Sequence, residues 1–195
     1  MKTKGLILCA LIALLSLNGI AQDNQKRFAF ELNSGASLAT RKLGDAKLKT
    51  GFGFEGIFHY RFMPHTGIYA GWGWNKFATG TSFAGNNMDF VETGYVFGLQ
   101  FNHPIVNTTV SYYLRAGGLY NHIEIENADG DITKDTGHRL GWQLTGGVDI
   151  PLGDHWSFIP GVKFNSLSGQ VSIDENKMLL DLNYLSVRLG FIKKF

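Results

Sequence analysis

The feature that most constrains this chain is an alternation of apolar residues with small or polar residues, at a period of two, along most of its length. In the stretch 51–62, Phe52, Phe54 and Phe58 share one set of positions, while Glu55 and His59 fall in the other set. Successive side chains of a β-strand point to opposite faces, so this alternation predicts strands with one apolar face. Comparable alternation occurs at 28–37, 67–77, 92–101, 108–121, 139–150, 156–167 and 184–191, which makes eight predicted strands.

The connections between the predicted strands are short and long by turns. The short connections are Met63–Thr66, Asn102–Asn107 and Pro151–His155, and the long ones are Thr40–Lys49, Ala78–Asp89, Ile123–Thr136 and Ser168–Asp181. An antiparallel meander with tight turns at one end and long loops at the other accounts for this order. Both ends of the chain then lie on the side of the tight turns, which is the periplasmic side of an outer-membrane barrel.

The residue types decide which face of such a barrel is outside, because a soluble eight-stranded barrel would place its apolar face inward. The polar positions hold mostly Gly, Ser, Thr, Asn and Gln, and only 17% of the chain is charged, where about 25% is usual. Bulky aromatic residues such as Trp72 and Trp142 occupy the apolar positions, many near strand ends, as at a membrane interface. We therefore predict an all-β protein, an eight-stranded antiparallel up-and-down transmembrane β-barrel, which leaves no unpaired edge in lipid. Pro160 lacks an N–H, so we expect it at a bulge or where strand pairing ends.

The first 21 residues are predicted to be an export signal. Lys2 and Lys4 precede an apolar run from Leu6 to Leu17, and Gly19 and Ala21 stand where signal peptidase needs small residues. The apolar run is shorter than the roughly 20 residues of a membrane-spanning helix. We predict cleavage after Ala21, so that residues 1–21 are a signal peptide and residues 22–195 form an outer-membrane β-barrel domain.

The composition of the exported part excludes several kinds of chemistry. The single cysteine of the sequence, Cys9, lies in the predicted signal, so disulfides, thiol catalysis and zinc–thiolate sites are excluded. The chain has 18 Lys and Arg, of which two belong to the signal, against 16 Asp and Glu, so the exported part is formally neutral. Neutrality argues against a nucleic-acid partner.

Charged residues at the polar positions of the strands form the main candidate site. The interior of an eight-stranded barrel is just wide enough for side chains, and charges there must pair because an uncompensated buried charge is costly. We interpret the set as a structural network of salt bridges, with an ion or proton path as the alternative. Its members are Glu31, Glu55, Glu92 and Asp149, opposed by Arg61, Arg115, Arg139, Lys163 and Arg188.

Three segments resemble the small outer-membrane β-barrels described as the outer membrane protein β-barrel domain or porin family. They are Tyr112–Gly118, Gly147–Leu152 and Leu182–Phe191. The resemblance covers Phe28–Phe195 and extends in architecture to the OmpA membrane domain, OmpX and OmpW. It implies a place in the outer membrane of a Gram-negative cell, among outer-membrane lipid and lipopolysaccharide.

The end of the chain carries a second resemblance. Arg188, Gly190 and Phe195 are similar to the signal that the barrel-assembly machinery reads, which implies that machinery as a partner during biogenesis. Lys193 departs from the signal, because an apolar residue is usual at that position.

Three short motifs have catalytic or ligand-binding counterparts elsewhere. His155-Trp156-Ser157 has the His-x-Ser spacing of a barrel that deacylates lipid A, but it falls in a tight turn. Gly51–Gly56 matches G-x-G-x-x-G inside a strand, with no helix N-terminus to hold phosphate. Asn127–Asp135 resembles a calcium loop without its Gly at the sixth position or Glu at the twelfth. No pair of the six histidines has metal-ligand spacing on one element, so we expect no catalytic, cofactor or metal residues.

The long polar loops are the expected place of function, because binding residues commonly lie on loops held by a rigid scaffold. We expect a non-enzymatic role in the structure of the envelope or in surface interaction, with an extracellular ligand that the sequence does not name. The alternatives are a narrow passive pore, a lipid A-modifying enzyme and an accessory role in protein secretion.

Overall fold

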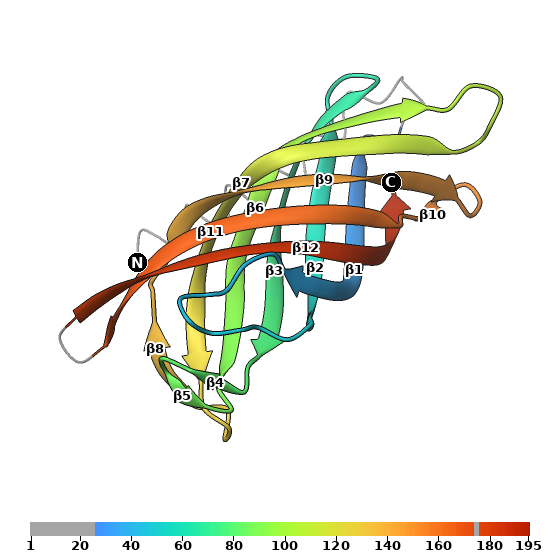
Figure 1. Ribbon diagram of the computed structural model, residues 1–195. Coiled ribbons are helices and arrows are strands. Elements are labelled where there is room, and N and C mark those ends of the chain that lie inside the picture. Colours follow the sequence, from blue (N-terminus) through green and yellow to red (C-terminus); the bar gives the residue numbers. More distant parts are fainter. Residues whose placement is uncertain (1–25, 174–175) are drawn as a thin grey trace, which may run out of the picture.

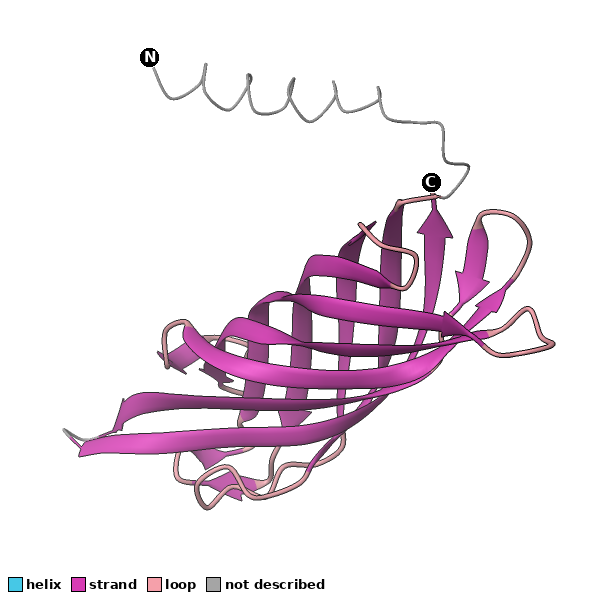
Figure 2. Cartoon of the chain, turned by 90° about the horizontal axis from the view of Figure 1, so that it is seen from above, coloured by secondary structure: helices cyan, strands magenta, loops and turns pink. Residues whose placement is uncertain are grey.

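The computed structural model describes residues 26–173 and 176–195. The predicted signal peptide, with Cys9, lies outside the described residues. The described chain consists of strands and their connections, as the colouring of Figure 2 shows. Within it, no helix has the length and apolar character needed to cross a membrane.

Eight long antiparallel segments form a closed ring. Short strands lie at the ends of the ring (Figure 1). Seven of the segments are single strands, and β10 and β11 together make the seventh in chain order. The ring closes because the first strand pairs with the last, from Ala29 with Lys194 to Ala39 with Tyr184. The strands are β1 Phe28–Ala39, β2 Gly51–Arg61, β3 Thr66–Ala78, β4 Thr81–Ser82, β5 Gly85–Asn86, β6 Asp89–Pro104, β7 Ser111–Glu126, β8 Ile132–Asp135, β9 Arg139–Pro151, β10 Trp156–Phe158, β11 Gly161–Ile173 and β12 Asn176–Lys194. The predicted fold is thus confirmed.

The strands are staggered around the ring. A path of directly paired residues that starts at Phe28 returns to the first strand at Leu38, ten residues further along. The steps of this path are Phe28, Tyr60, Ile68, Leu99, Ala116, Leu144, Phe164, Leu185 and Leu38. Such a stagger requires strongly tilted strands, and transmembrane barrels have tilts of roughly 35–45°.

The two faces of the ring follow the predicted alternation. Every residue on the path just described belongs to the outward face, where Phe58 is 68% exposed and Leu99 57% exposed although both are apolar. Outward aromatic rings pack against one another across strands, as Phe30 does with Phe58 at 4.8 Å and Trp142 with Phe164 at 5.3 Å between ring centroids. An apolar surface of this extent is suited to lipid rather than water.

The two ends of the barrel differ. We call the end that holds the connections 62–65, 105–110 and 152–155 the turn end, and the opposite end the loop end. In Figure 1, β4, β5 and β8 lie at the loop end, and β10 lies near the C-terminus at the turn end.

At the loop end, one predicted loop is wrong. The stretch Ser168–Asp181 is a continuation of the hairpin of β11 and β12, paired from Ser168 with Asp181 to Ile173 with Asn176. The stretch Ile123–Thr136 is also partly strand, because β7 runs to Glu126 and β8 pairs back onto it. These segments lie beyond the membrane-facing part of the strands. Apolar side chains of both segments, such as Ile125 and Val171, point into the barrel rather than outward to lipid, so the continuous apolar outward face by which the other strands are recognised is missing.

Apolar side chains fill the barrel at the loop end. Leu43 and Ala46, from the connection between β1 and β2, are fully buried there and exchange two backbone hydrogen bonds of 3.0 Å. Gly44 supplies the positive φ of 61° that this tight turn requires. We call this group the apolar cap, and its buried members are Leu43, Ala46, Phe77, Met88, Phe90, Ile123, Ile125, Leu167, Val171, Leu180, Leu182 and Tyr184.

Pro160 lies where pairing is interrupted, one of the two expected arrangements. The strand assignment stops at Phe158 and resumes at Gly161. The register is unchanged across this gap on both sides, so no residue is inserted and there is no bulge. The carbonyl of Pro160 still accepts a hydrogen bond of 3.0 Å from the N–H of Val148, but Pro160 donates none in return.

Candidate functional site in the barrel interior

The layer of the interior nearest the turn end is built around the carboxylate of Glu31. Arg115 donates to both oxygens of Glu31, from Nη1 at 3.1 Å and from Nη2 at 2.5 Å, in a two-pronged ion pair. His59 lies 3.0 Å from the same carboxylate, and the side-chain amide of Asn33 donates to it at 2.7 Å. All four side chains come from inward positions of β1, β2 and β7 and are buried. A carboxylate with this many donors is compensated for its removal from water.

Aromatic and amide side chains complete the environment of Arg115. The guanidinium carbon of Arg115 lies 4.5 Å from the ring centroid of Tyr113 and 5.8 Å from that of Tyr69. The Nε–H of Arg115 donates to Gln100 at 2.7 Å. The guanidinium is therefore held by a carboxylate, an amide and two aromatic rings at once.

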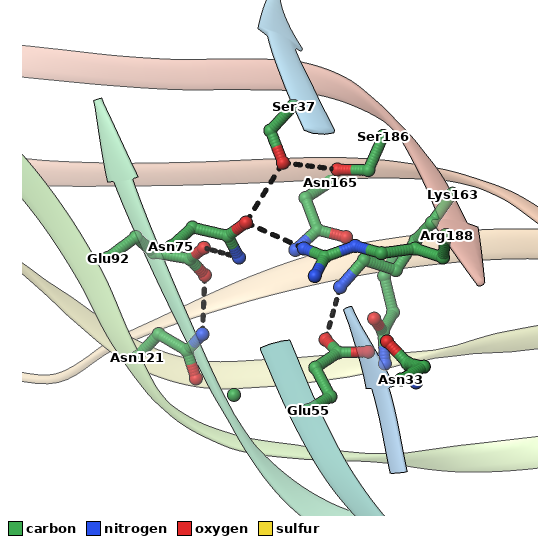
Figure 3. A network of polar contacts seen from close by, with 12 residues as sticks. Asn33, Ser37, Glu55, Asn75, Glu92, Asn121, Lys163, Asn165, Ser186 and Arg188 are labelled. Carbon is green, nitrogen blue, oxygen red and sulfur yellow. Dashed lines mark hydrogen bonds and ion pairs between the residues drawn. The ribbon is translucent and has the colours of Figure 1, made fainter. Parts of the chain in front are cut away.

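The middle layer contains the ion pair of Lys163 with Glu55. Both side chains are buried, and they come from β11 and β2 on different sides of the ring. Arg188 lies in the same region, and its Nη2 donates to the side-chain oxygen of Asn75 at 2.6 Å (Figure 3). Asn75 thus links this layer to the next.

The layer nearest the apolar cap is built around Glu92. No Lys or Arg among the described residues forms an ion pair with this carboxylate. Instead, the Tyr184 hydroxyl donates to Glu92 at 2.5 Å. The side-chain amides of Asn121 and Asn75 also donate to it, and Figure 3 shows both beside the carboxylate. The Tyr184 hydroxyl in turn accepts a hydrogen bond of 2.6 Å from Asn165. A buried carboxylate is here satisfied by neutral donors.

The remaining predicted residues lie at the ends of the barrel. Asp149 forms an ion pair of 2.6 Å with Lys194, whose ammonium also donates to Ser157. Arg61 lies at the mouth of the turn end, where its Nη2 donates to the backbone carbonyl of Lys26 at 2.9 Å. Asp149 and Arg61 both line a cavity at the turn end or its mouth, and in the described part of the chain neither forms an ion pair with the central layers of charged side chains.

Arg139 corrects the predicted set. It is the first residue of β9, at the loop end, and its side chain is exposed. The alternation of β9 places Arg139 in phase with inward residues such as Gln143, but the strand begins beyond the buried part of the interior. The alternation in the sequence predicts whether a side chain points inward or outward, but not where along the barrel axis the residue lies.

Little space remains among these side chains. The cavity between the first two layers, lined by Glu31, Glu55, Arg115, Lys163 and Arg188 among others, has a volume of about 10 Å³. That is room for about one water molecule. Several buried polar atoms here, including Nε and Nη1 of Arg188, have no protein partner. Such atoms are the ones that an internal water would satisfy.

The turn end of the barrel is hollow. A cavity of about 390 Å³ opens there, and its lining includes His59, Arg61, Gln100, Asp149 and Lys194. From this cavity to the loop end, the polar layers and then the apolar cap follow one another.

The residues of the three short motifs are not brought together in a catalytic or ligand-binding arrangement in the residues that the structure describes. His155 is exposed in the connection to β10, whereas Ser157 points inward and interacts with Lys194, and no hydrogen bond joins the two within the described chain. Gly51–Gly56 lies within β2. Asn127 begins a turn in which its own side-chain oxygen accepts from the N–H groups of Asp129 and Asp131.

Sequence reasoning missed the aromatic and amide members of the interior. Tyr69, Tyr113 and Tyr184 are buried among the charges, and so are Asn75 and Asn121. The signal that could have found them is phase, because each of these residues occurs at an inward position of its strand. The residue type alone does not distinguish a buried tyrosine, because lipid-facing girdles are also rich in aromatic residues.

Comparison with known proteins identifies the family. The family model described as "Outer membrane protein beta-barrel domain" matches residues 7–192, so the chain belongs to this family of small outer-membrane barrels. The resemblance predicted from the sequence is therefore confirmed. No curated protein is similar enough in sequence to match.

Several solved structures have the same fold. Neisserial surface protein A is 13% identical, with a TM-score of 0.63 over 86% of this chain and 97% of that one. OprG from Pseudomonas aeruginosa is 16% identical, with a TM-score of 0.60 over 88% of this chain and 97% of that one. OmpW from E. coli is 14% identical, with a TM-score of 0.57 over 89% of this chain and all of that one. At these identities the similarity is one of fold.

Proposed function

We propose that this protein is exported by its N-terminal segment and acts in the outer membrane as a closed, non-enzymatic barrel. Its role is in the structure of the envelope or in surface interaction through the loop end. The outward apolar face contacts lipid and lipopolysaccharide, and the last strand, with Arg188, Gly190 and Phe195, is read by the barrel-assembly machinery during insertion.

The observation that carries the proposal is the closure of the interior. Glu31 and Arg115, then Glu55 and Lys163, then Glu92 and its neutral donors occupy successive levels. The apolar cap follows them at the loop end. A permeating ion would have to separate buried ion pairs and then enter apolar surroundings, and both steps are energetically unfavourable. Transport along the barrel axis is thus disfavoured.

The exposed parts of the molecule are consistent with an interaction role. In outer-membrane barrels the tight turns face the periplasm and the longer connections face outside. The loop end carries β4, β5, β8 and the extension of the β11–β12 hairpin, all held by the rigid ring. Extended strands present more ordered surface than flexible loops, which lowers the entropy lost on binding a partner.

Conductance measurement tests the closed state. We expect the refolded protein to give no stable channels in a planar lipid bilayer, with insertion verified separately by the heat-dependent mobility of the barrel in detergent gels. Stable unitary conductance of the inserted protein would overturn the proposal and favour a porin. In cells, a deletion strain should show envelope sensitivity or loss of a surface interaction, restored by the whole chain. A variant whose 127–131 turn is replaced should restore a structural role in the envelope but not a surface interaction.

A further inference from the structure

Two carboxylates and an imidazole meet on the outward side of the loop end, apart from the interior network. His122 and Glu124 occupy outward positions of β7, and Asp135 ends β8, which folds back onto β7. One side-chain donor atom from each of the three residues lies within 4.8 Å of the other two. Sequence inspection missed this group because His122 and Asp135 are 13 residues apart and belong to different strands.

The arrangement of the charges favours a cation. Glu124 and Asp135 are directly opposite each other in the pairing of β7 with β8. Like charges at directly opposite positions of one sheet face destabilise the pairing. His122 lies between them, with Nδ1 3.0 Å from both oxygens of Asp135 and Nε2 3.7 Å from Oε1 of Glu124. A positive ion coordinated by these groups would remove the repulsion.

The surroundings hold the donors in place. The N–H of Gly137 donates to Asp135 at 2.7 Å, which fixes the orientation of that carboxylate. Thr136 ties the return of the chain to β7, because its hydroxyl accepts from the N–H of Ile123 at 2.9 Å. The side chains of His122 and Glu124 are 15% and 16% exposed, while that of Asp135 is 42% exposed. His122 and Glu124 are therefore largely buried, whereas Asp135 is held by Gly137 and remains open to solvent.

The position of the group gives it access to ions in the medium. The ring of His138 stacks on that of His122 at 4.4 Å between centroids and lies 4.9 Å from the ring of Tyr120. Aromatic residues at this level of a barrel mark the membrane interface, so His122 lies just beyond the lipid on the loop side.

We propose that His122, Glu124 and Asp135 form a binding site for a divalent transition-metal ion of the Zn²⁺ class. Mixed nitrogen and oxygen donors suit such ions, whereas Ca²⁺ and Mg²⁺ prefer oxygen donors alone. One nitrogen of His122 and one carboxylate oxygen each of Glu124 and Asp135 bind the metal. The site is independent of the proposed function, since it lies outside the barrel interior.

Calorimetric titration of Zn²⁺ into the folded, detergent-solubilised mature chain tests the site. We expect one saturable Zn²⁺ per barrel, absent in His122→Ala and weakened in Asp135→Asn. Two matched variants should bind like the wild type. Asp129→Asn removes an exposed carboxylate of the same connection, and His103→Ala removes one of the two stacked histidines at the turn end.

The outcomes separate the proposal from its rivals. Absence of saturable binding in the wild type, or unchanged binding in His122→Ala, would overturn the site. Loss of binding in His103→Ala alone would place the metal at the turn end and overturn it as well. Ca²⁺ that competes equally with Zn²⁺ would contradict the assigned class of ion. Heat-dependent mobility of each variant verifies that it is folded, and His122→Gln repeats the test in a variant that keeps a polar side chain of similar length.

Discussion

Arg115 and Arg139 occupy inward phases of neighbouring strands, yet their environments are opposite. Arg115 is 6% exposed and donates to Glu31 and Gln100. Arg139 is exposed at the loop end, outside the interior layers. At the scale of single residues, the depth of a charge along the barrel axis therefore decides whether it is structural.

These two arginines make a matched pair for a stability measurement. Arg115→Ala leaves the buried carboxylate of Glu31 without its main partner, so we expect a loss of about 3–5 kcal/mol in the free energy of unfolding. Arg139→Ala should change that free energy by less than about 0.5 kcal/mol. Urea unfolding of the refolded barrels, followed by tryptophan fluorescence, gives both values. Equal effects of the two substitutions would contradict the assigned network.

The sequence allowed the charged members of the interior to be predicted better than their partners. Glu31, Glu55 and Lys163 stand out because charge is rare on the strands, and an interior position is the only one lipid allows them. Tyr184 has no such signal of its own, because a tyrosine is equally suited to the membrane interface. Its role depends on Asn75, Glu92 and Asn165, which come from three other strands, and that proximity exists only once the ring has closed.

Among the elements, the segment formed by β10 and β11 is irregular, because its pairing is interrupted at Pro160. Val148 and Pro160 are opposite each other, and the bond from Val148 to the Pro160 carbonyl shows that they occupy a hydrogen-bonded position. In an ordinary antiparallel pair of this type the two residues exchange two hydrogen bonds, so the carbonyl of Val148 lacks one donor here. Because Val162 is two residues further along β11, it occupies the next hydrogen-bonded position, opposite Gly146.

The substitutions Pro160→Val and Val162→Pro should change the free energy of unfolding in opposite directions. Pro160→Val restores an N–H facing the Val148 carbonyl, so we expect stabilisation by about 0.5–1.5 kcal/mol. Val162→Pro removes such a donor in lipid, so we expect destabilisation by about 1–3 kcal/mol or more. The measurement is again urea unfolding followed by tryptophan fluorescence, with the barrels refolded in lipid vesicles. Destabilisation by Pro160→Val would show that the interruption of pairing at this position is itself required by the ring.

The elements were predictable where lipid imposes a pattern and unpredictable where it does not. The outward sets around Phe54, Phe97 and Leu189 follow from alternation, because each strand there has one face in lipid and one in the interior. The segment Ser168–Asp181 lies beyond the lipid, and its buried side chains, such as Val171, belong to the apolar cap instead. Its outward positions lack the bulky apolar residues of the lipid-facing strands in the part before the hairpin turn, so the stretch resembles a loop in sequence although it is paired as a strand.

On the scale of the whole molecule, the barrel is asymmetric along its axis. The turn end is hollow and polar, with a cavity of about 390 Å³, whereas the loop end is filled by the apolar cap. A barrel plugged at one end presents different surfaces to the two sides of a membrane. The assignment of those sides rests on the rule that tight turns of outer-membrane barrels face the periplasm.

Two introduced cysteines test this orientation, since residues 22–195 contain no other thiol. Asp129 lies in the connection between β7 and β8 at the loop end, and Asp154 lies in the tight connection between β9 and β10; both are exposed. The contact of Asp154 with Lys26 uses its backbone carbonyl, so Asp154→Cys leaves that contact intact. Neither substitution removes a buried group, and each should cost less than about half a kcal/mol. An impermeant thiol reagent on intact cells should label Asp129→Cys and spare Asp154→Cys, with both labelled after lysis. Labelling in the reverse order would mean an inverted barrel, and equal labelling of the two variants in intact cells would mean that the chain does not span the membrane.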